Sequence, residues 1–132
     1  MLRPFKKDKV KIFVAEDDED ISALLVHILE REGFEVIHAA DGKEALSIIR
    51  TEAPPEIACL DLMMPFRDGF HLLKEIRQSP TWNQVTVIML SSKTNEKDII
   101  RALNSGANDY ITKPFNPQEL TARIKRSLRD KA

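Results

Sequence analysis

The sequence predicts one α/β domain in which a parallel sheet is covered by helices on both faces. Five short apolar runs alternate along the chain with five segments of helical periodicity. Strands that alternate with helices form right-handed crossovers, and such crossovers make the strands parallel. The 132 residues suffice for one hydrophobic core and are too few for two domains.

The predicted strands are short runs rich in Val, Ile and Thr. This brevity and this β-branched content favour strand over helix. In chain order the strands cover residues 10–15, 35–38, 56–60, 85–90 and 110–112.

The predicted helices carry apolar residues three and four positions apart, which is the spacing of one buried helix face. The first helix covers residues 21–29, and Gly33 suits a position just past its C-cap. The last helix is opened by Pro117 near its first turn. This last helix covers residues 118–129, and the three helices in between cover residues 43–52, 69–78 and 96–105.

The composition excludes several classes of protein. The net charge of −1 creates no global field toward nucleic acid or an anionic membrane. No apolar stretch approaches the ~20 residues that a membrane helix needs. The single cysteine, Cys59, cannot form an internal disulfide, which fits a reducing cytosol. We therefore expect a cytoplasmic chain that neither enters a membrane nor binds nucleic acid directly.

The first nine residues form a predicted basic tail. Lysine and arginine crowd this segment, but no apolar region follows that would make it a secretory signal. We expect the folded domain to cover residues 10–129, with residues 130–132 as a short C-terminal end. The chain would then be either a single-domain protein or one part of a longer one.

Polar residues follow the predicted strands at their carboxyl ends, where ligands bind in open α/β sheets. Glu16 and Asp17 follow the first strand, and Asp61 follows the third. Ser91 follows the fourth strand and Lys113 the fifth. Acids, a hydroxyl group and a lysine should therefore converge on one rim of the sheet.

The acids of this rim predict a cation site. Glu16, Asp17 and Asp61 repel one another when crowded, unless a cation lies among them. Mg²⁺ is suited to such a site because it takes one or two carboxylates and keeps several waters. Asp61 is then either a metal ligand only or a nucleophile that accepts a phosphoryl group. Lys113 and Ser91 are of the types that neutralise and position phosphoryl oxygens.

Four segments together resemble the receiver domain of two-component response regulators. They are "IFVAEDDEDI", "CLDLMMPFRDG", "VIMLSSK" and "GANDYITKPF", in the order and spacing of the family. The resemblance covers residues 10–129. It implies a flavodoxin-like (βα)5 doubly wound sheet of five parallel strands in the order 2-1-3-4-5, which brings the first and third strands side by side.

The resemblance also implies roles for the rim acids. Asp61 matches the phosphoacceptor, and Glu16 and Asp17 match the acidic pair of the metal site. Asp17 would bind Mg²⁺, or Mn²⁺, directly, whereas Glu16 would act largely through water. Met63 would contribute only its backbone carbonyl to the metal.

Three further residues match switch and binding positions of the family. Ser91 matches the switch hydroxyl, Tyr110 the aromatic switch residue, and Lys113 the lysine that pairs with the phosphate. The Lys113–Pro114 bond is typically cis in the family. Phe66 departs from the family, since many members have glycine there, so the turn after Asp61 should be less permissive.

The implied function is a signalling switch. A histidine kinase or histidine phosphotransfer protein would donate a phosphoryl group to Asp61, and the chain would catalyse only its own phosphorylation and dephosphorylation. The switched face would be that of the fourth helix, fifth strand and fifth helix, with partner binding or homodimer formation as the output. An alternative is a phosphatase of the haloacid dehalogenase type, which wants a second acid where this chain has Met63. A degenerate receiver used only for binding would lack the acids or the lysine, and this chain keeps both.

Overall fold

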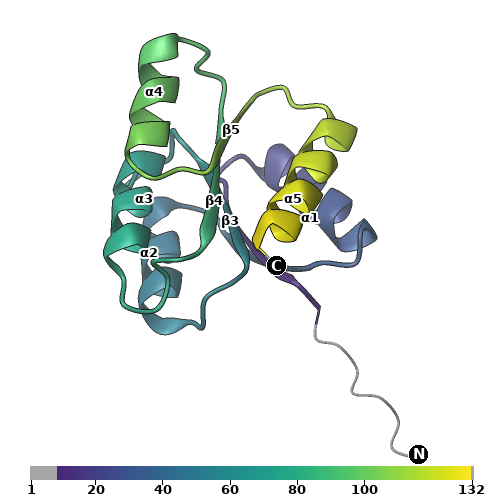
Figure 1. Cartoon of the computed structure of the whole chain (residues 1–132), viewed down its shortest axis with the longest axis horizontal. Helices are drawn as coiled ribbons and strands as arrows, with labels where there is room; N and C mark the ends of the chain where they lie inside the picture. The colour runs from purple at the N-terminus through teal and green to yellow at the C-terminus, as the bar shows by residue number, and fades with distance from the viewer. Residues whose placement is uncertain (1–8, 132) are drawn as a thin grey trace, which may run out of the picture.

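A five-stranded parallel sheet with helices on both faces forms the structure, a computed structural model that describes residues 9–131 (Figure 1). The strand order is β2-β1-β3-β4-β5. The predicted class and strand order are both confirmed. The predicted tail lies outside the described residues except for Lys9, and so does Ala132 of the predicted C-terminal end.

The strands match the predicted runs to within one residue at every end. Their bounds are Lys11–Ala15 for β1, Glu35–Ala39 for β2, Ile57–Asp61 for β3, Thr86–Ser91 for β4 and Asp109–Thr112 for β5. The sequence predicted that Asp61 and Ser91 follow their strands, but each is the last residue of one. Parallel pairing continues that far, because Asp61 is in register with Leu90 and Ser91 with Thr112.

The helices begin where polar side chains cap them. Asp18 accepts hydrogen bonds from the N–H groups of Asp20 and Ile21, which starts the first helix two residues before the predicted position. Asp41, Asp68 and Asn95 cap the next three helices in the same way. The bounds are Glu19–Arg31 for α1, Gly42–Thr51 for α2, Gly69–Gln78 for α3, Glu96–Asn104 for α4 and Pro117–Lys131 for α5.

The core lies in two layers, one on each face of the sheet. Helices α2, α3 and α4 cover one face, and α1 and α5 cover the other (Figure 1). Side chains of β1 alternate between the two layers: Phe13 and Ala15 join the first, Ile12 and Val14 the second. Every residue of β3 and β4 is buried, as expected for central strands of a parallel sheet. No helix among residues 9–131 is long and apolar enough to cross a membrane.

Trp82 anchors the core at the amino ends of β3 and β4, away from the polar rim. Its side chain is fully buried, although it belongs to the polar segment "SPTWNQ". Its Nε1 donates a hydrogen bond of 2.9 Å to the carbonyl of Glu52, and its ring meets Phe13 edge to face at 5.5 Å between centroids. The indole therefore fixes the α3–β4 connection both by packing and by a buried hydrogen bond.

We expect Trp82→Phe to destabilise the domain by about 1–3 kcal/mol, because the carbonyl of Glu52 loses its donor and the smaller ring leaves a void. Urea unfolding should show a lower midpoint with an unchanged slope. Trp82→Ala, which removes the aromatic contact as well, should cost about 3–5 kcal/mol. Equal stability of Trp82→Phe and the natural chain would contradict this account of the hydrogen bond.

Candidate functional site

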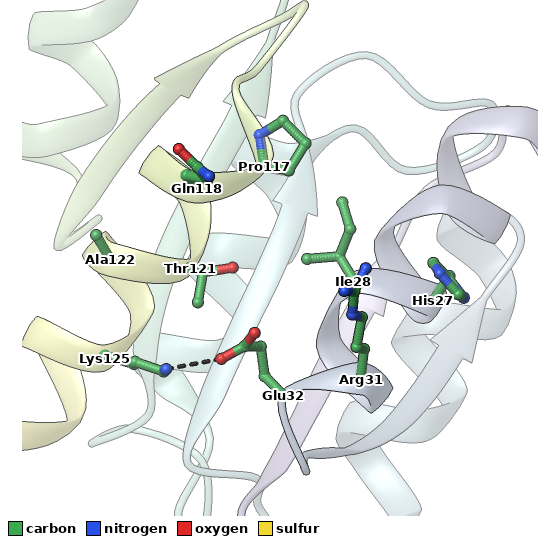
Figure 2. Close-up of a pocket in the computed structure, with 9 residues that line it drawn as sticks. All are labelled: His27, Ile28, Arg31, Glu32, Pro117, Gln118, Thr121, Ala122 and Lys125. Atoms are coloured by element: carbon green, nitrogen blue, oxygen red, sulfur yellow. Dashed lines mark ion pairs between the residues drawn. The ribbon is translucent and has the colours of Figure 1, made fainter.

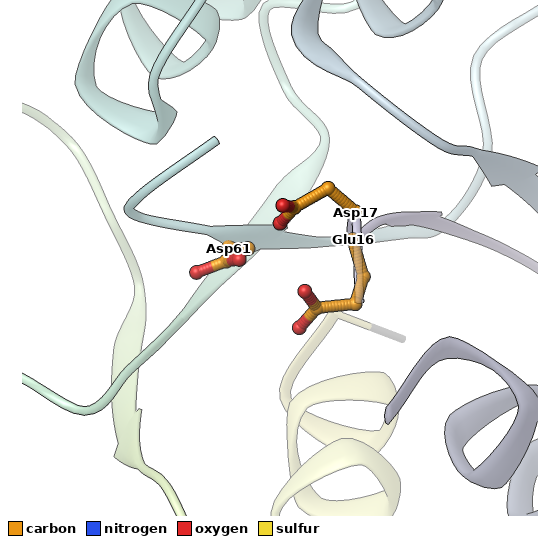
Figure 3. A group of neighbouring side chains, drawn as sticks. All are labelled: Glu16, Asp17 and Asp61. Atoms are coloured by element: carbon orange, nitrogen blue, oxygen red, sulfur yellow. The ribbon is translucent and has the colours of Figure 1, made fainter. Parts of the chain in front are cut away.

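Three carboxylates meet at the carboxyl ends of β1 and β3 (Figure 3). Glu16 and Asp17 directly follow β1, and Asp61 ends the neighbouring β3. Each side chain offers an oxygen, and these oxygens all lie within 4.8 Å of one another. Glu16 and Asp61 are buried, with exposed fractions of 1% and 5%, whereas Asp17 is exposed. The predicted convergence of the acids is therefore present.

Lys113 reaches into this cluster from the end of β5. Its Nζ lies 2.6 Å from Oε1 of Glu16 and 3.3 Å from Oδ1 of Asp61. Desolvation alone would lower the pKa of Lys113, but the hydrogen bonds and charges of the two carboxylates outweigh it and raise the pKa. Lys113 is therefore a permanent cation in the site. Its bond to Pro114 is cis, as the resemblance implied.

Glu16 is held by two donors, one at each oxygen of its carboxylate. Oε1 accepts from Lys113, and Oε2 accepts a hydrogen bond of 3.1 Å from the backbone N–H of Asp18. The backbone carbonyl of Glu16 lies 2.9 Å from Nε2 of His38 on the adjacent strand. No local pattern in the sequence marks His38 as a neighbour of the site, because the contact depends on the pairing of β1 with β2.

Asp61 carries an unfavourable negative charge in this setting. Burial, followed by the hydrogen bond and charge of Glu16, raises its pKa from the ordinary 3.8 to about 7, although Lys113 and the N–H of Met63 oppose the shift. The Met63 N–H donates to Oδ1 of Asp61 at 3.2 Å. One lysine therefore leaves part of the negative charge of the cluster uncompensated.

The donor set fits a hard divalent cation. Three carboxylates with one lysine leave an excess of negative charge, and all the donor atoms are oxygens, which Mg²⁺ and similar ions prefer. A cavity of about 540 Å³ opens over Glu16, Asp17, Asp61 and Lys113, and Met63 also lines it. The thioether of Met63 is a soft ligand that Mg²⁺ does not prefer, so only the backbone carbonyl of this residue is chemically suited to such an ion.

Ser91 and Tyr110 are joined through Lys93 rather than directly to the carboxylates. Oγ of the buried Ser91 accepts a hydrogen bond of 2.9 Å from the N–H of Lys93, and the Tyr110 hydroxyl donates one of 2.8 Å to the Lys93 carbonyl. Sequence reasoning named Ser91 and Tyr110 but missed the backbone of Lys93 between them. The two predicted switch side chains thus share one segment of the β4–α4 connection.

A second hollow lies between α1 and α5 (Figure 2). It is on the face of the sheet that α2, α3 and α4 do not cover. It measures about 500 Å³ and is crossed by an ion pair of 2.7 Å between Lys125 and Glu32. None of the predicted site residues lines it. The candidate site is therefore the cavity at the carboxyl ends of the strands.

The fold and the acidic rim together define a class of protein, and comparison with known proteins identifies it. Residues 12–125 match the family model of the response regulator receiver domain. The chain belongs to this family, the receiver domains of two-component response regulators, which bind a divalent metal.

The relatives and structural neighbours agree with this assignment. The chain is 44% identical over 119 residues to the alkaline phosphatase synthesis transcriptional regulatory protein PhoP of Bacillus subtilis, covering 90% of this chain and 48% of the relative. A Francisella response regulator receiver domain superposes with a TM-score of 0.86 at 35% identity, covering 94% of this chain and all of that one. The receiver domain of a Pseudomonas aeruginosa sensor histidine kinase has a TM-score of 0.82 at 27% identity, covering 90% of this chain and 97% of that one. That structure has a magnesium ion coordinated in its active-site cleft. The chain spans about half the length of the curated relatives that it matches.

We expect the metal-free domain to lose stability as the pH rises from about 4 to about 7. The folded state binds the Asp61 proton more tightly than the unfolded chain does. The contribution of this proton to folding stability is therefore complete below pH 3.8, the ordinary pKa, and is lost as the pH rises to the folded-state pKa of about 7. Asp61→Asn, which faces Glu16 and Lys113 without a charge, should therefore raise stability at pH 8 by on the order of 2 kcal/mol.

Thermal unfolding in a chelating buffer between pH 5 and pH 8 measures this effect. The control is Asp130→Asn, which removes one charge from the exposed end of α5. If the two variants show the same pH dependence, Asp61 does not carry the unfavourable charge.

Proposed function

We propose that Asp61 accepts a phosphoryl group from a phosphohistidine of a histidine kinase or histidine phosphotransfer protein, in a reaction that requires Mg²⁺ or Mn²⁺. The observation that carries this proposal is the position of Asp61, which is buried, lines the cavity, and lies within reach of Lys113 and of the other two acids. The domain is then a signalling switch that catalyses only its own phosphorylation and dephosphorylation. Its site of action is the cytoplasm.

The transfer exchanges one bond to phosphorus for another. A carboxylate oxygen of Asp61 attacks the phosphorus, the P–N bond to the donor imidazole breaks, and the leaving imidazole takes up a proton from solvent. Lys113, with its Nζ 3.3 Å from Oδ1 of Asp61, is placed to pair with an oxygen of the transferred group. The N–H of Met63 orients the attacking carboxylate.

Glu16, Asp17, Asp61 and the Met63 carbonyl are the groups that would hold the metal. When bound, the ion neutralises charge on the phosphoryl oxygens. Two observations support Mg²⁺: the oxygen-only donor set, and the magnesium ion of the structurally similar Pseudomonas receiver domain. Asp17 is the most accessible of the three acids, which suits direct binding, while Glu16 is already engaged by Lys113.

The output face in this proposal is formed by α4, β5 and α5. A phosphoryl group on Asp61 would attract the Ser91 hydroxyl, which then releases the Lys93 N–H. Since Tyr110 is bonded to the Lys93 carbonyl, movement of this segment reaches β5. Hydrogen bonds through Lys93 thus link Ser91, on the strand next to that of Asp61, with Tyr110 on the output face.

Incubation with acetyl phosphate and Mg²⁺ should add one phosphoryl group to the chain, detected by intact mass. Asp61→Asn should abolish the addition, and so should removal of the metal with a chelator. Asp130→Asn, with an exposed acid removed far from the cavity, should be phosphorylated normally. Phosphorylation of Asp61→Asn would refute the acceptor assignment.

The aspartyl phosphate should hydrolyse slowly, because Met63 offers no strong hydrogen bond to orient water for in-line attack. Met63, two residues after Asp61, is apolar and 58% exposed at the mouth of the cavity. Met63→Asn or Met63→Glu can hold a water and should speed hydrolysis by ~10-fold, equivalent to about 1.4 kcal/mol. Phosphate release from the purified phosphoprotein measures the rate, and Met63→Leu, which stays apolar, is the control. Fast decay of the natural chain would refute the prediction.

Phosphorylation should promote self-association through the output face. Ile100 and Leu103 of α4 are 48% and 45% exposed there. Asp109 pairs with Arg123 at 2.8 Å within the chain, and such mixed charges can re-pair across a two-fold interface. Sedimentation with and without beryllofluoride, which stands in for the phosphoryl group, tests this. Ile100→Glu should prevent association, whereas Ser47→Glu on α2 should not, and a monomer under both conditions would contradict the prediction.

A further inference from the structure

The connection between β3 and α3, residues 62–68, is a closed loop that rests on the start of α2. The N–H of Gly69 donates to the Leu62 carbonyl at 2.9 Å and closes the loop at its base. At the tip, the Pro65 carbonyl accepts two hydrogen bonds, one of 2.9 Å from Arg67 and one of 3.2 Å from the N–H of Gly42 in α2. We call residues 62–68 the acceptor loop, because they directly follow Asp61 and include Met63.

The tip of the acceptor loop has an unfavourable backbone conformation. The Pro65–Arg67 hydrogen bond spans three residues with Phe66 at the centre, and Phe66 has a φ of 72°. This combination describes a γ-turn with positive φ, which is rare and strained for a residue with a side chain. Phe66 is 74% exposed, so side-chain packing does little to hold the turn. Other contacts must therefore stabilise it.

Gly42 supplies those contacts. Its N–H bonds to the Pro65 carbonyl, and a Cβ built at Gly42 would overlap the backbone oxygen and nitrogen of Arg67. Gly42 has no positive φ, so the close approach of the acceptor loop, rather than backbone conformation, requires glycine here. Any side chain at this position would push the tip of the loop away from α2.

We propose that Gly42 is a positioning residue for the metal site. By holding the tip of the acceptor loop against α2, it fixes the backbone of Met63 beside the cavity that the three carboxylates line, where the Met63 N–H donates to Oδ1 of Asp61 at 3.2 Å. This inference rests on the proposed function, since it assigns the Met63 carbonyl to the metal. The residue does not touch the metal or the phosphoryl group itself and acts through the loop.

A positioning role and a merely structural role predict different results. If Gly42 only maintains packing, its replacement lowers folding stability and leaves the metal affinity of the folded molecules unchanged. If Gly42 positions the loop, the affinity for Mg²⁺ itself falls. By linkage, bound Mg²⁺ must then also stabilise the contact between Gly42 and Pro65.

The first test compares Gly42→Ala with Gly33→Ala. Gly33 has a φ of 93° and open space around it, so its substitution strains the backbone at the end of α1 without any contact to the acceptor loop. Mg²⁺ binding is measured by calorimetry, and phosphorylation by acetyl phosphate is followed over a range of Mg²⁺ concentrations. Gly42→Ala should bind Mg²⁺ about tenfold more weakly, and its phosphorylation should need correspondingly more Mg²⁺ for half-saturation while approaching the natural rate at saturation. Gly33→Ala should match the natural chain in both.

The second test uses the natural chain and does not depend on the folding of a variant. Amide hydrogen exchange of Gly42 should slow on addition of Mg²⁺ by a larger factor than that of Glu52, whose N–H bonds to Ile48 at the other end of α2. Unchanged Mg²⁺ affinity in Gly42→Ala, or equal slowing at Gly42 and Glu52, would overturn the inference while leaving the proposed function intact. Failure of the natural chain to bind Mg²⁺ would overturn both.

Discussion

The repulsion among Glu16, Asp17 and Asp61 is the constraint on which the rest of the site depends. Two of these acids are buried, and Lys113 balances only part of their charge. Each compensating group arrives from a different element: a backbone N–H of the segment before α1, the lysine after β5, and the N–H of Met63 after β3. The sheet therefore does more than support the site, because its strand order and register bring these groups within hydrogen-bond distance.

The cost of crowding these charges gives the site its chemical character. A carboxylate that is unfavourable to ionise is stabilised by any cation that enters the cavity. It is also stabilised when its negative charge is spread over the oxygens of a larger group, such as a phosphoryl group. The two-layer core allows the rim to carry this cost, since every residue of β3 and β4 is buried and their pairing extends to Asp61. Stability is thus concentrated in the central strands, and reactivity at their ends.

Much of this arrangement could be predicted from the sequence, for reasons visible in particular residues. The apolar runs end at Ala15, Leu60 and Leu90, so the polar residues that follow mark the rim. Other features depend on contacts between distant segments. The bond from Lys113 to Glu16 joins residues 97 positions apart, and the requirement for glycine at position 42 arises only where the acceptor loop meets α2. The burial of Trp82 is equally hidden in the sequence, because the fully buried indole lies in a polar segment.

The two edges of the sheet favour a particular kind of assembly. At one edge, β2 has exposed charged and polar side chains at Glu35 and His38, and Glu35 is paired with Lys11 at 3.8 Å. At the other edge, β5 is only four residues long and lies between α4 and α5 (Figure 1). Short or charged edges discourage other strands from adding to a sheet. The domain is therefore protected against fibre-like growth through its backbone and can reserve contacts between molecules for its helices, whose side chains can distinguish one partner from another.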